Sequence, residues 1–238
     1  MKRILFLMSL ASFVVAAPAP APTGTWSFDE GSGTNVGDSS GSGLNGVTTA
    51  AWGPGKVGKA VVLSGTNKHF VKLSVPKDKQ PGKGSFTIAC WIQPTTFDIE
   101  SKQKQRRFFG FDKWPWFFVV GDLLGDGRVN VSGGYKADSN SQALNSSCNS
   151  QKAIALGQWT HVALVCDREA GKLRIFLNGL LDAEATPSKE WLDKADLSGD
   201  QPFTVGSSWQ SFAGSVDELK YWKKPLGPEE IKALAGVK

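Results

Sequence analysis

The clearest pattern of hydrophobic and polar positions spans Trp159–Ala183 and predicts consecutive β-strands. From Leu173 to Leu177, apolar residues recur at every second position, which is the period expected when one face of a strand is buried. The preceding segment 159–166 is apolar on both faces, which indicates a central strand covered on both sides. Asn178-Gly179 tolerates the positive φ angles of a tight turn. This stretch therefore predicts a β-hairpin.

Similar short apolar segments, separated by Gly-rich turns, predict further strands along the chain. In Phe86–Gln93 one face is apolar throughout. Two long polar stretches, 133–157 and 185–201, are predicted to be loops. Pro228–Ala235 is predicted to be a short helix, because it begins with proline and two acidic residues follow. Many short strands with almost no helix predict a β-sandwich formed by one domain.

The N-terminal residues have the features of an export signal. Lys2-Arg3 is followed by the apolar segment Ile4–Ala16, which is too short to span a bilayer. We expect residues 1–16 to be a signal peptide, 17–22 (APAPAP) to be a stiff spacer and 23–238 to be the folded domain. The predicted location is therefore outside the cytoplasm, either extracellular or periplasmic.

Composition and charge narrow the class of protein. The chain of 238 residues contains 9 Trp and 14 Phe, enough for a sizeable core. Loss of the signal lowers the formal charge from +5 to +3, which does not indicate a nucleic-acid-binding protein. Three cysteines, Cys90, Cys148 and Cys166, allow at most one disulfide. Buried free thiols at 90 and 166 are equally compatible with the pattern.

Several sequence blocks occur in the order of a known family. They are WSFDEGSG, DSSGSGLNG, GKVGKAVVLSG, SFTIACWIQP, GQWTHVALVCD, LRIFLNG, FTVGSS and GSVDELKYWKKPLGPEEI. From about Thr23 to the C-terminus, this order resembles a laminin-G-like domain of the concanavalin A-like lectin/glucanase superfamily, of the exported bacterial type. The resemblance implies a jelly-roll sandwich of two antiparallel sheets, so the expected fold is an all-β jelly roll with the one short C-terminal helix predicted above. Such folds are used mostly for binding glycans or proteins and sometimes for catalysis.

The sequence offers little support for glycoside hydrolysis. Glycosidases of this superfamily use paired carboxylates in a motif such as E-x-D-x-x-E, which is not found here. Asp182 and Glu184 share one strand face, but they follow a hairpin turn, where a solvated charge pair is common. We therefore expect a non-catalytic module, and an enzyme with an unrecognised carboxylate site is an alternative.

The resemblance also implies a structural calcium ion, since jelly rolls of this type often bind Ca²⁺ through loop carboxylates. The candidate ligands are Asp38 in the DSSG turn and Asp217 in GSVDE, with Asp126 in a GDG turn as a weaker third. The alternative is that Asp38 caps its own turn and Asp217 pairs with a nearby base.

Glycan binding requires an exposed aromatic face with polar neighbours. Four tryptophans lie in strand patterns and are predicted to be core residues: Trp26, Trp91, Trp159 and Trp222. Four others lie in turns or loops and are the candidate ligand-binding residues, although loop tryptophans can also fold inward: Trp114, Trp116, Trp191 and Trp209. The basic segment 102–107 either favours an anionic polysaccharide or is a solvated loop.

The leading hypothesis is a secreted, non-catalytic module that binds carbohydrate through loop aromatics, with calcium as a structural ion. The first alternative is an adhesion or envelope module that binds another protein, and the second is a polysaccharide-active enzyme. Expected partners are a polysaccharide or glycan, or a protein, with no nucleic acid and no membrane span.

Overall fold

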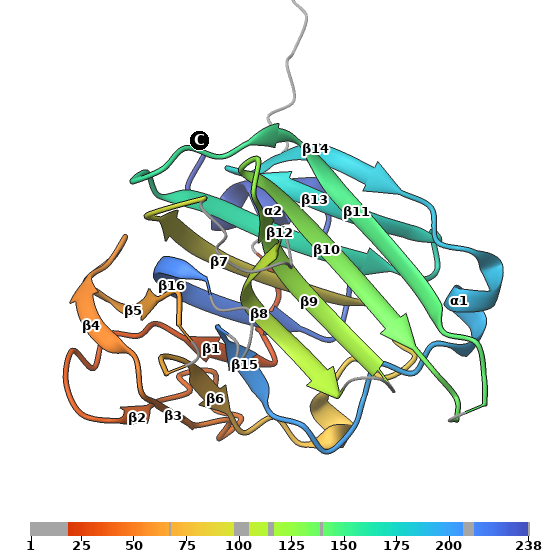
Figure 1. Cartoon of the computed structure of the whole chain (residues 1–238), viewed down its shortest axis with the longest axis horizontal. Helices are drawn as coiled ribbons and strands as arrows, with labels where there is room; N and C mark the ends of the chain where they lie inside the picture. The colour runs from red at the N-terminus through yellow and green to blue at the C-terminus, as the bar shows by residue number, and fades with distance from the viewer. Residues whose placement is uncertain are drawn as a thin grey trace, which may run out of the picture.

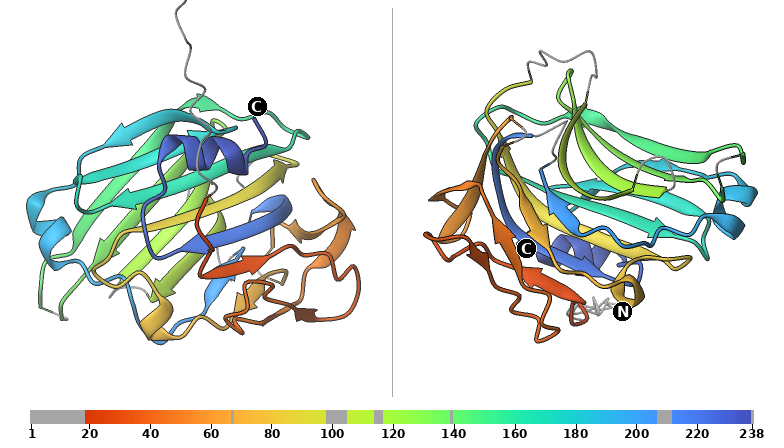
Figure 2. Two further views of the ribbon diagram at one scale, coloured as in Figure 1. Left: turned by 180° about the vertical axis from the view of Figure 1, so that it is seen from behind. Right: turned by 60° about the horizontal axis from the view of Figure 1, so that its bottom comes forward.

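The computed structural model describes residues 19–66, 68–97, 105–113, 117–138, 140–206 and 212–237. In these residues the chain folds into two antiparallel β-sheets packed face to face (Figure 1). The right view in Figure 2 shows the two layers from the side. The predicted signal peptide, residues 1–16, lies outside the described residues. No helix in the described part of the chain is long and apolar enough to span a membrane.

The first sheet, here called sheet A, has the strand order β14-β13-β12-β7-β16-β5-β4, and β1 pairs with β16 beside this path. Its strands are β1 (Gly24–Trp26), β4 (Ala51–Pro54), β5 (Lys59–Ser64), β7 (Phe86–Pro94), β12 (Thr160–Asp167), β13 (Lys172–Leu177), β14 (Leu180–Ala185) and β16 (Ala213–Trp222). The predicted hairpin around Asn178-Gly179 is confirmed as β13 and β14.

The second sheet, sheet B, has the order β11-β10-β9-β8-β15-β6-β3-β2. Its strands are β2 (Asn35–Val36), β3 (Gly46–Thr48), β6 (Val71–Leu73), β8 (Gln105–Lys113), β9 (Phe117–Leu124), β10 (Arg128–Tyr135), β11 (Leu144–Ala153) and β15 (Phe203–Val205). A 3₁₀ turn, Lys77–Lys79, lies between β6 and β7 in the chain. The arrangement confirms the predicted jelly-roll sandwich.

The main core fills the space between the sheets and is rich in aromatic side chains. Phe111 and Phe203 stack with ring centroids 4.5 Å apart. Trp26 is fully buried, and its indole N–H donates to the carbonyl of Leu44 at 2.8 Å. That hydrogen bond satisfies the polar atom that burial of a tryptophan would otherwise leave unpaired.

A second hydrophobic cluster covers part of the outer face of sheet A. Helix α2 (Pro228–Leu234) lies against this face (Figure 2, left). Its buried Ile231 belongs to one cluster with Val165 and Trp222. The side chain of Glu230 accepts the N–H of Gly227 at 2.7 Å at the start of the helix. The prediction that β12 is covered on both sides is therefore confirmed, and so is the C-terminal helix.

Two stretches predicted as loops contain regular structure. Residues 144–153 form β11 at one edge of sheet B, and helix α1 (Lys189–Lys194) interrupts 185–201. The β11 sequence is mostly Ser, Asn and Gln, and only Cys148 and Ser150 are buried. An edge strand that presents one face to solvent needs few apolar residues, so its hydrophobic signal was too weak to identify.

The cysteines form no disulfide. Cys90, Cys148 and Cys166 are each free and buried. Of the two possibilities left open by the sequence, the structure therefore favours buried thiols.

Candidate functional site

Trp191, predicted to be a ligand-binding residue, is not at the surface. Its side chain is 0% exposed and projects from α1 into the core. The indole N–H donates to the carbonyl of Gly133 at 3.0 Å, and the Arg168 guanidinium lies 4.8 Å from the ring centroid. The prediction is wrong because a short helix folds this residue over one end of the sandwich. Three other candidates lie outside the described residues: Trp114, Trp116 and Trp209.

Asp38 binds backbone groups of its own turn region and of strand β1. Its carboxylate accepts the N–H groups of Thr25 (3.0 Å), Ser40 (2.9 Å) and Leu44 (2.9 Å). Partial burial acts to raise the pKa of Asp38, but these hydrogen bonds outweigh it and the pKa is lowered. This is the turn-capping role that the sequence offered as the alternative to calcium binding. Among the described residues, no group of three or more His, Cys, Asp or Glu side chains is placed to hold a metal ion.

We expect Asp38→Ala to lower the free energy of unfolding by about 1–3 kcal/mol, because three backbone donors lose their acceptor. Since the pKa is lowered in the fold, this stabilisation is present above the unfolded value of 3.8 and is lost as the pH falls below it. Urea unfolding of both proteins, with calcium and with EDTA, measures the effect. A calcium-dependent gain in the wild type that the variant lacks would instead support a metal-binding role.

Asp217, the second calcium candidate, holds a turn in place. The residue is 0% exposed, and its two carboxylate oxygens accept the N–H groups of Val57 (3.0 Å) and Glu218 (2.7 Å). Val57 belongs to the turn between β4 and β5, residues 55–58, which is thereby fixed over the outer face of sheet A. Burial is the main reason that the pKa of Asp217 is raised to about 6, and the charge of Glu218 adds to it.

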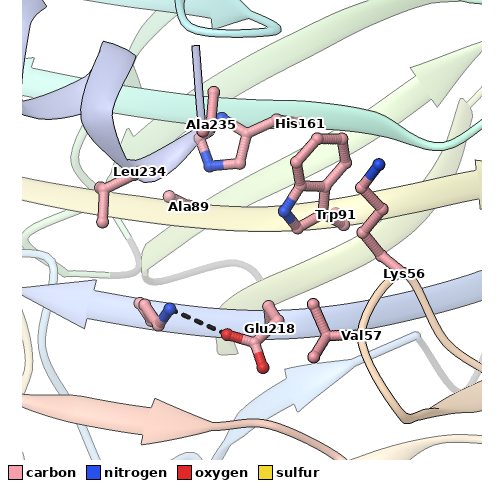
Figure 3. A pocket seen from close by; sticks show the side chains of 10 residues that line it. Lys56, Val57, Ala89, Trp91, His161, Glu218, Leu234 and Ala235 are labelled. Atoms are coloured by element: carbon pink, nitrogen blue, oxygen red, sulfur yellow. Dashed lines mark hydrogen bonds and ion pairs between the residues drawn. The ribbon is translucent and has the colours of Figure 1, made fainter. Parts of the chain in front are cut away.

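A pocket of about 390 Å³ opens beside this turn, on the part of sheet A that α2 leaves uncovered (Figure 3). Its floor is formed by β7, β12 and β16, and its walls by the β4–β5 turn and the C-terminal end of α2. The lining residues are Lys56, Val57, Ala89, Trp91, His161, Glu218, Lys220, Leu234, Ala235 and Gly236. We call it the Trp91 pocket.

Trp91 forms the aromatic surface of this pocket. In β7 the alternating residues Cys90 and Ile92 point into the main core, so Trp91 points to the outer face, where it is partly exposed. The Lys56 ammonium lies 4.4 Å from its ring centroid, and the His161 ring meets it edge-on at 5.3 Å. The prediction of Trp91 as a core residue is wrong, because α2 covers only part of the sheet.

His161 lies opposite Trp91 in the pairing of β12 with β7. The side chain is 3% exposed, and within the described residues its Nδ1 has no hydrogen-bond partner. Burial, aided by the charge of Lys220, lowers the pKa of His161 to about 4, so the imidazole is neutral at pH 7. This agrees with the sequence-based interpretation of a packed histidine, now placed at the edge of a pocket.

Glu218 stands at an irregular point of β16. The pairing of β16 with β7 shifts register between Asp217 and Lys220, and Glu218 adopts φ 50°, a left-handed conformation that is uncommon outside glycine. Its carboxylate pairs with the Lys220 ammonium at 2.9 Å. Backbone strain of this kind persists only where the surrounding structure imposes it, and it is often found at functional sites.

Asp182 and Glu184, the carboxylates that share a strand face, form hydrogen bonds and salt bridges with other residues of the chain. Asp182 accepts the N–H of Gln151 at 2.6 Å. Glu184 forms salt bridges with Arg174 (2.7 Å) and Lys172 (2.9 Å). This is the solvated charge arrangement expected after a hairpin turn.

The two packed sheets and the partial helical cover define a concanavalin A-like jelly-roll protein. A family model described as "Concanavalin A-like lectin/glucanases superfamily", of the laminin-G type, matches residues 65–232, and the chain belongs to this family. A search of curated proteins finds no match.

Solved structures support the fold. Domain 4 of AbnA, an extracellular arabinanase of Geobacillus stearothermophilus, solved with arabinotriose, has a TM-score of 0.61 and 22% identity, over 90% of this chain and 98% of that one. The binding domain of Paraclostridial Mosquitocidal Protein 1 has a TM-score of 0.69 and 13% identity, and the match covers 90% of this chain and 52% of that one. The binding domain of botulinum neurotoxin DC, solved in complex with rat synaptotagmin II, has a TM-score of 0.63 and 13% identity. The match covers 91% of this chain and 51% of that one. The chain thus spans about half the length of the toxin domains.

Proposed function

We propose that the protein is an exported carbohydrate-binding module and that the Trp91 pocket holds the sugar. The observation that carries this proposal is a partly exposed tryptophan on a rigid sheet, surrounded by charged and polar side chains in one pocket. A sugar ring presents C–H groups on its faces and hydroxyl groups around its edge. An aromatic surface with hydrogen-bonding neighbours therefore complements it.

The size and the polar groups of the pocket fit this ligand class. Its volume of about 390 Å³ lies in the usual range for small-molecule sites. Glu218 can accept hydrogen bonds from sugar hydroxyls, and Lys56 and Lys220 can donate them. The small side chain of Ala89 beside Trp91 leaves room above the sheet for a ring to lie against the indole.

The comparison with the arabinanase domain supports the same interpretation. That domain is covered over 98% of its length by this chain and was solved in complex with arabinotriose. At 22% identity the likeness concerns the fold, so it supports a module of this size and shape as a sugar binder without naming the sugar.

A protein-binding module is the second candidate. Leu180 and Leu181, the first two residues of β14, are 61% and 51% exposed. Exposed apolar side chains are a feature of protein-binding surfaces. One of the toxin domains with this fold was solved in complex with a protein, synaptotagmin II.

The test is binding of the protein to a panel of soluble and insoluble polysaccharides, with the release of reducing ends measured in the same samples. We expect retention on one glycan class without release of sugar. Trp91→Ala should weaken that binding about tenfold or more, because the stacking surface is lost. Trp52→Ala is the matched control, since Trp52 is a partly buried tryptophan of β4 outside the pocket lining.

Thermal melting of each variant shows whether the fold is intact. Equal binding by the wild type and a folded Trp91→Ala variant would exclude this pocket as the sugar site. Absence of retention on every glycan would favour the protein-binding alternative, and release of reducing ends would show that the protein is an enzyme.

A further inference from the structure

Some charged side chains of the Trp91 pocket have a partner of opposite charge, and one, Lys56, has none among the described residues. Glu218 and Lys220 form a salt bridge at 2.9 Å, with side chains only 20% and 29% exposed, so these two charges largely offset each other. His161 is neutral at pH 7. Asp217 lies beneath the turn, and both of its carboxylate oxygens accept backbone N–H groups. Lys56 remains as a cation that, within the described residues, forms no salt bridge; its ammonium lies over the Trp91 ring instead.

The position of Lys56 is set by a tightly constrained turn. The N–H of Gly55 donates to the carbonyl of Gly58 at 3.1 Å, which closes the turn on itself. On either side of Gly58, the Val57 N–H is held by Asp217 at 3.0 Å and the Lys59 N–H by Asp29 at 2.8 Å. The backbone that carries Lys56 is therefore preorganised, and only its flexible side chain has to move when a ligand binds.

This arrangement affects neutral and anionic ligands differently. A neutral sugar that stacks on Trp91 competes with the Lys56 ammonium for the ring, so it displaces a cation–π contact without replacing it. A sugar that carries an anionic group lets the ammonium move from the ring to that group and form a charge-assisted hydrogen bond, while the sugar ring takes the aromatic face. The negative charge of Glu218 repels an anionic group on the sugar, but its salt bridge to Lys220 reduces that repulsion.

We propose that the Trp91 pocket selects an acidic sugar, one with a carboxylate or sulfate beside the ring that stacks on Trp91, and that Lys56 is the residue that determines this specificity. The proposal rests on the proposed function, because it assigns a ligand class to the same site. The uronate of a plant or algal polysaccharide and the sulfate ester of a sulfated galactan share this chemistry.

The experiment compares the affinities of the wild-type protein for oligogalacturonate, for the same oligosaccharide as its methyl ester, and for a sulfated galactan oligosaccharide, by titration calorimetry. The methyl ester retains the sugar and removes the charge. We expect the wild type to bind one of the two acidic probes about tenfold more tightly than the ester. The preference should shrink as salt is raised, because a partly exposed ion pair is screened. The two acidic arms show whether a carboxylate or a sulfate is the preferred group.

Three variants test the role of the Lys56 charge. Lys56→Met keeps the alkyl stem and should lose most of the preference for the acidic probe while binding the ester at least as well as the wild type does, because no cation–π contact has to be displaced. Lys56→Arg should restore the preference. Lys59→Met changes the net charge by the same amount at the exposed first residue of β5, directly after the same turn and outside the pocket lining, and should leave the preference intact.

The inference fails if the wild type binds neither acidic probe more tightly than the ester, or if Lys56→Met weakens the preferred acidic probe and the ester to the same extent. Trp91→Ala should weaken binding of the acidic probe and of the ester alike. A protein that binds neutral glycans through Trp91 without any acidic preference would retain the proposed function and contradict this inference alone. Absence of binding to every glycan in the panel would contradict both.

Discussion

Replacing Trp191 by alanine is expected to lower the free energy of unfolding by about 3–5 kcal/mol, the range for removing a large aromatic side chain from a core. The side chain is fully buried, and the surrounding residues cannot close a cavity of this size. The change also removes the donor to the Gly133 carbonyl and the ring beneath the Arg168 guanidinium. Urea unfolding followed by circular dichroism measures the loss.

Trp191→Phe is the matched control, because it retains an aromatic ring and removes the indole N–H. It should cost less than the alanine change, since most of the buried apolar volume remains. Glycan affinity per folded molecule should be the same in both variants as in the wild type. A Trp191→Ala protein that is as stable as the wild type but fails to bind sugar would restore Trp191 as a ligand-binding residue.

The second large effect concerns stability in acid. The pKa of His161 is lowered from 6.5 to about 4 in the fold, which corresponds to about 3 kcal/mol. Because the folded state holds the neutral form, this stabilisation is fully present above pH 6.5. It is lost as the pH falls from 6.5 towards 4, where the unfolded chain binds a proton that the folded chain does not.

Asp217 acts in the opposite direction over nearly the same range. Its pKa is raised from 3.8 to about 6, so the folded state binds the proton more tightly than the unfolded chain does. The resulting stabilisation is present below pH 3.8 and is lost as the pH rises through 6, again by about 3 kcal/mol. The two titrations therefore largely cancel in the wild type between pH 4 and 6.

Single substitutions should expose each contribution. In His161→Gln only the Asp217 effect remains, so the variant should gain stability relative to the wild type as the pH falls from 6.5 to 4. In Asp217→Asn only the His161 effect remains, so the variant should lose stability over the same range. Urea unfolding at half-unit pH intervals gives the slopes, and parallel curves for all three proteins would contradict this account of the buried charges.

Trp91 and Trp191 show which properties of a binding site the sequence can predict and which it cannot. Trp91 lies in an apolar strand and was predicted to be buried, whereas Trp191 lies in a polar stretch and was predicted to be exposed, and the structure reverses both. The alternation in β7 did place Trp91 on the face opposite Cys90 and Ile92. Which part of that face remains open depends on where α2 packs, and local periodicity carries no information about that.

The strand pattern itself was more informative. The central hairpin, the strand covered on both sides and the C-terminal helix follow from the spacing of apolar residues and from turn chemistry, which act over a few residues. The Trp91 pocket depends instead on contacts between distant parts of the chain. Asp217 meets Val57 across 160 positions of sequence, and no single-sequence pattern marks such a pair.

The three buried thiols have a practical consequence. Because Cys90, Cys148 and Cys166 are all unpaired and enclosed, the chain reaches its fold without an oxidant, and a maleimide reagent finds little natural thiol to attack. A cysteine introduced at Val57, which is 56% exposed on the wall of the Trp91 pocket, would then be the preferred labelling position. A fluorophore attached there would report ligand entry from a protein whose own cysteines need not be removed.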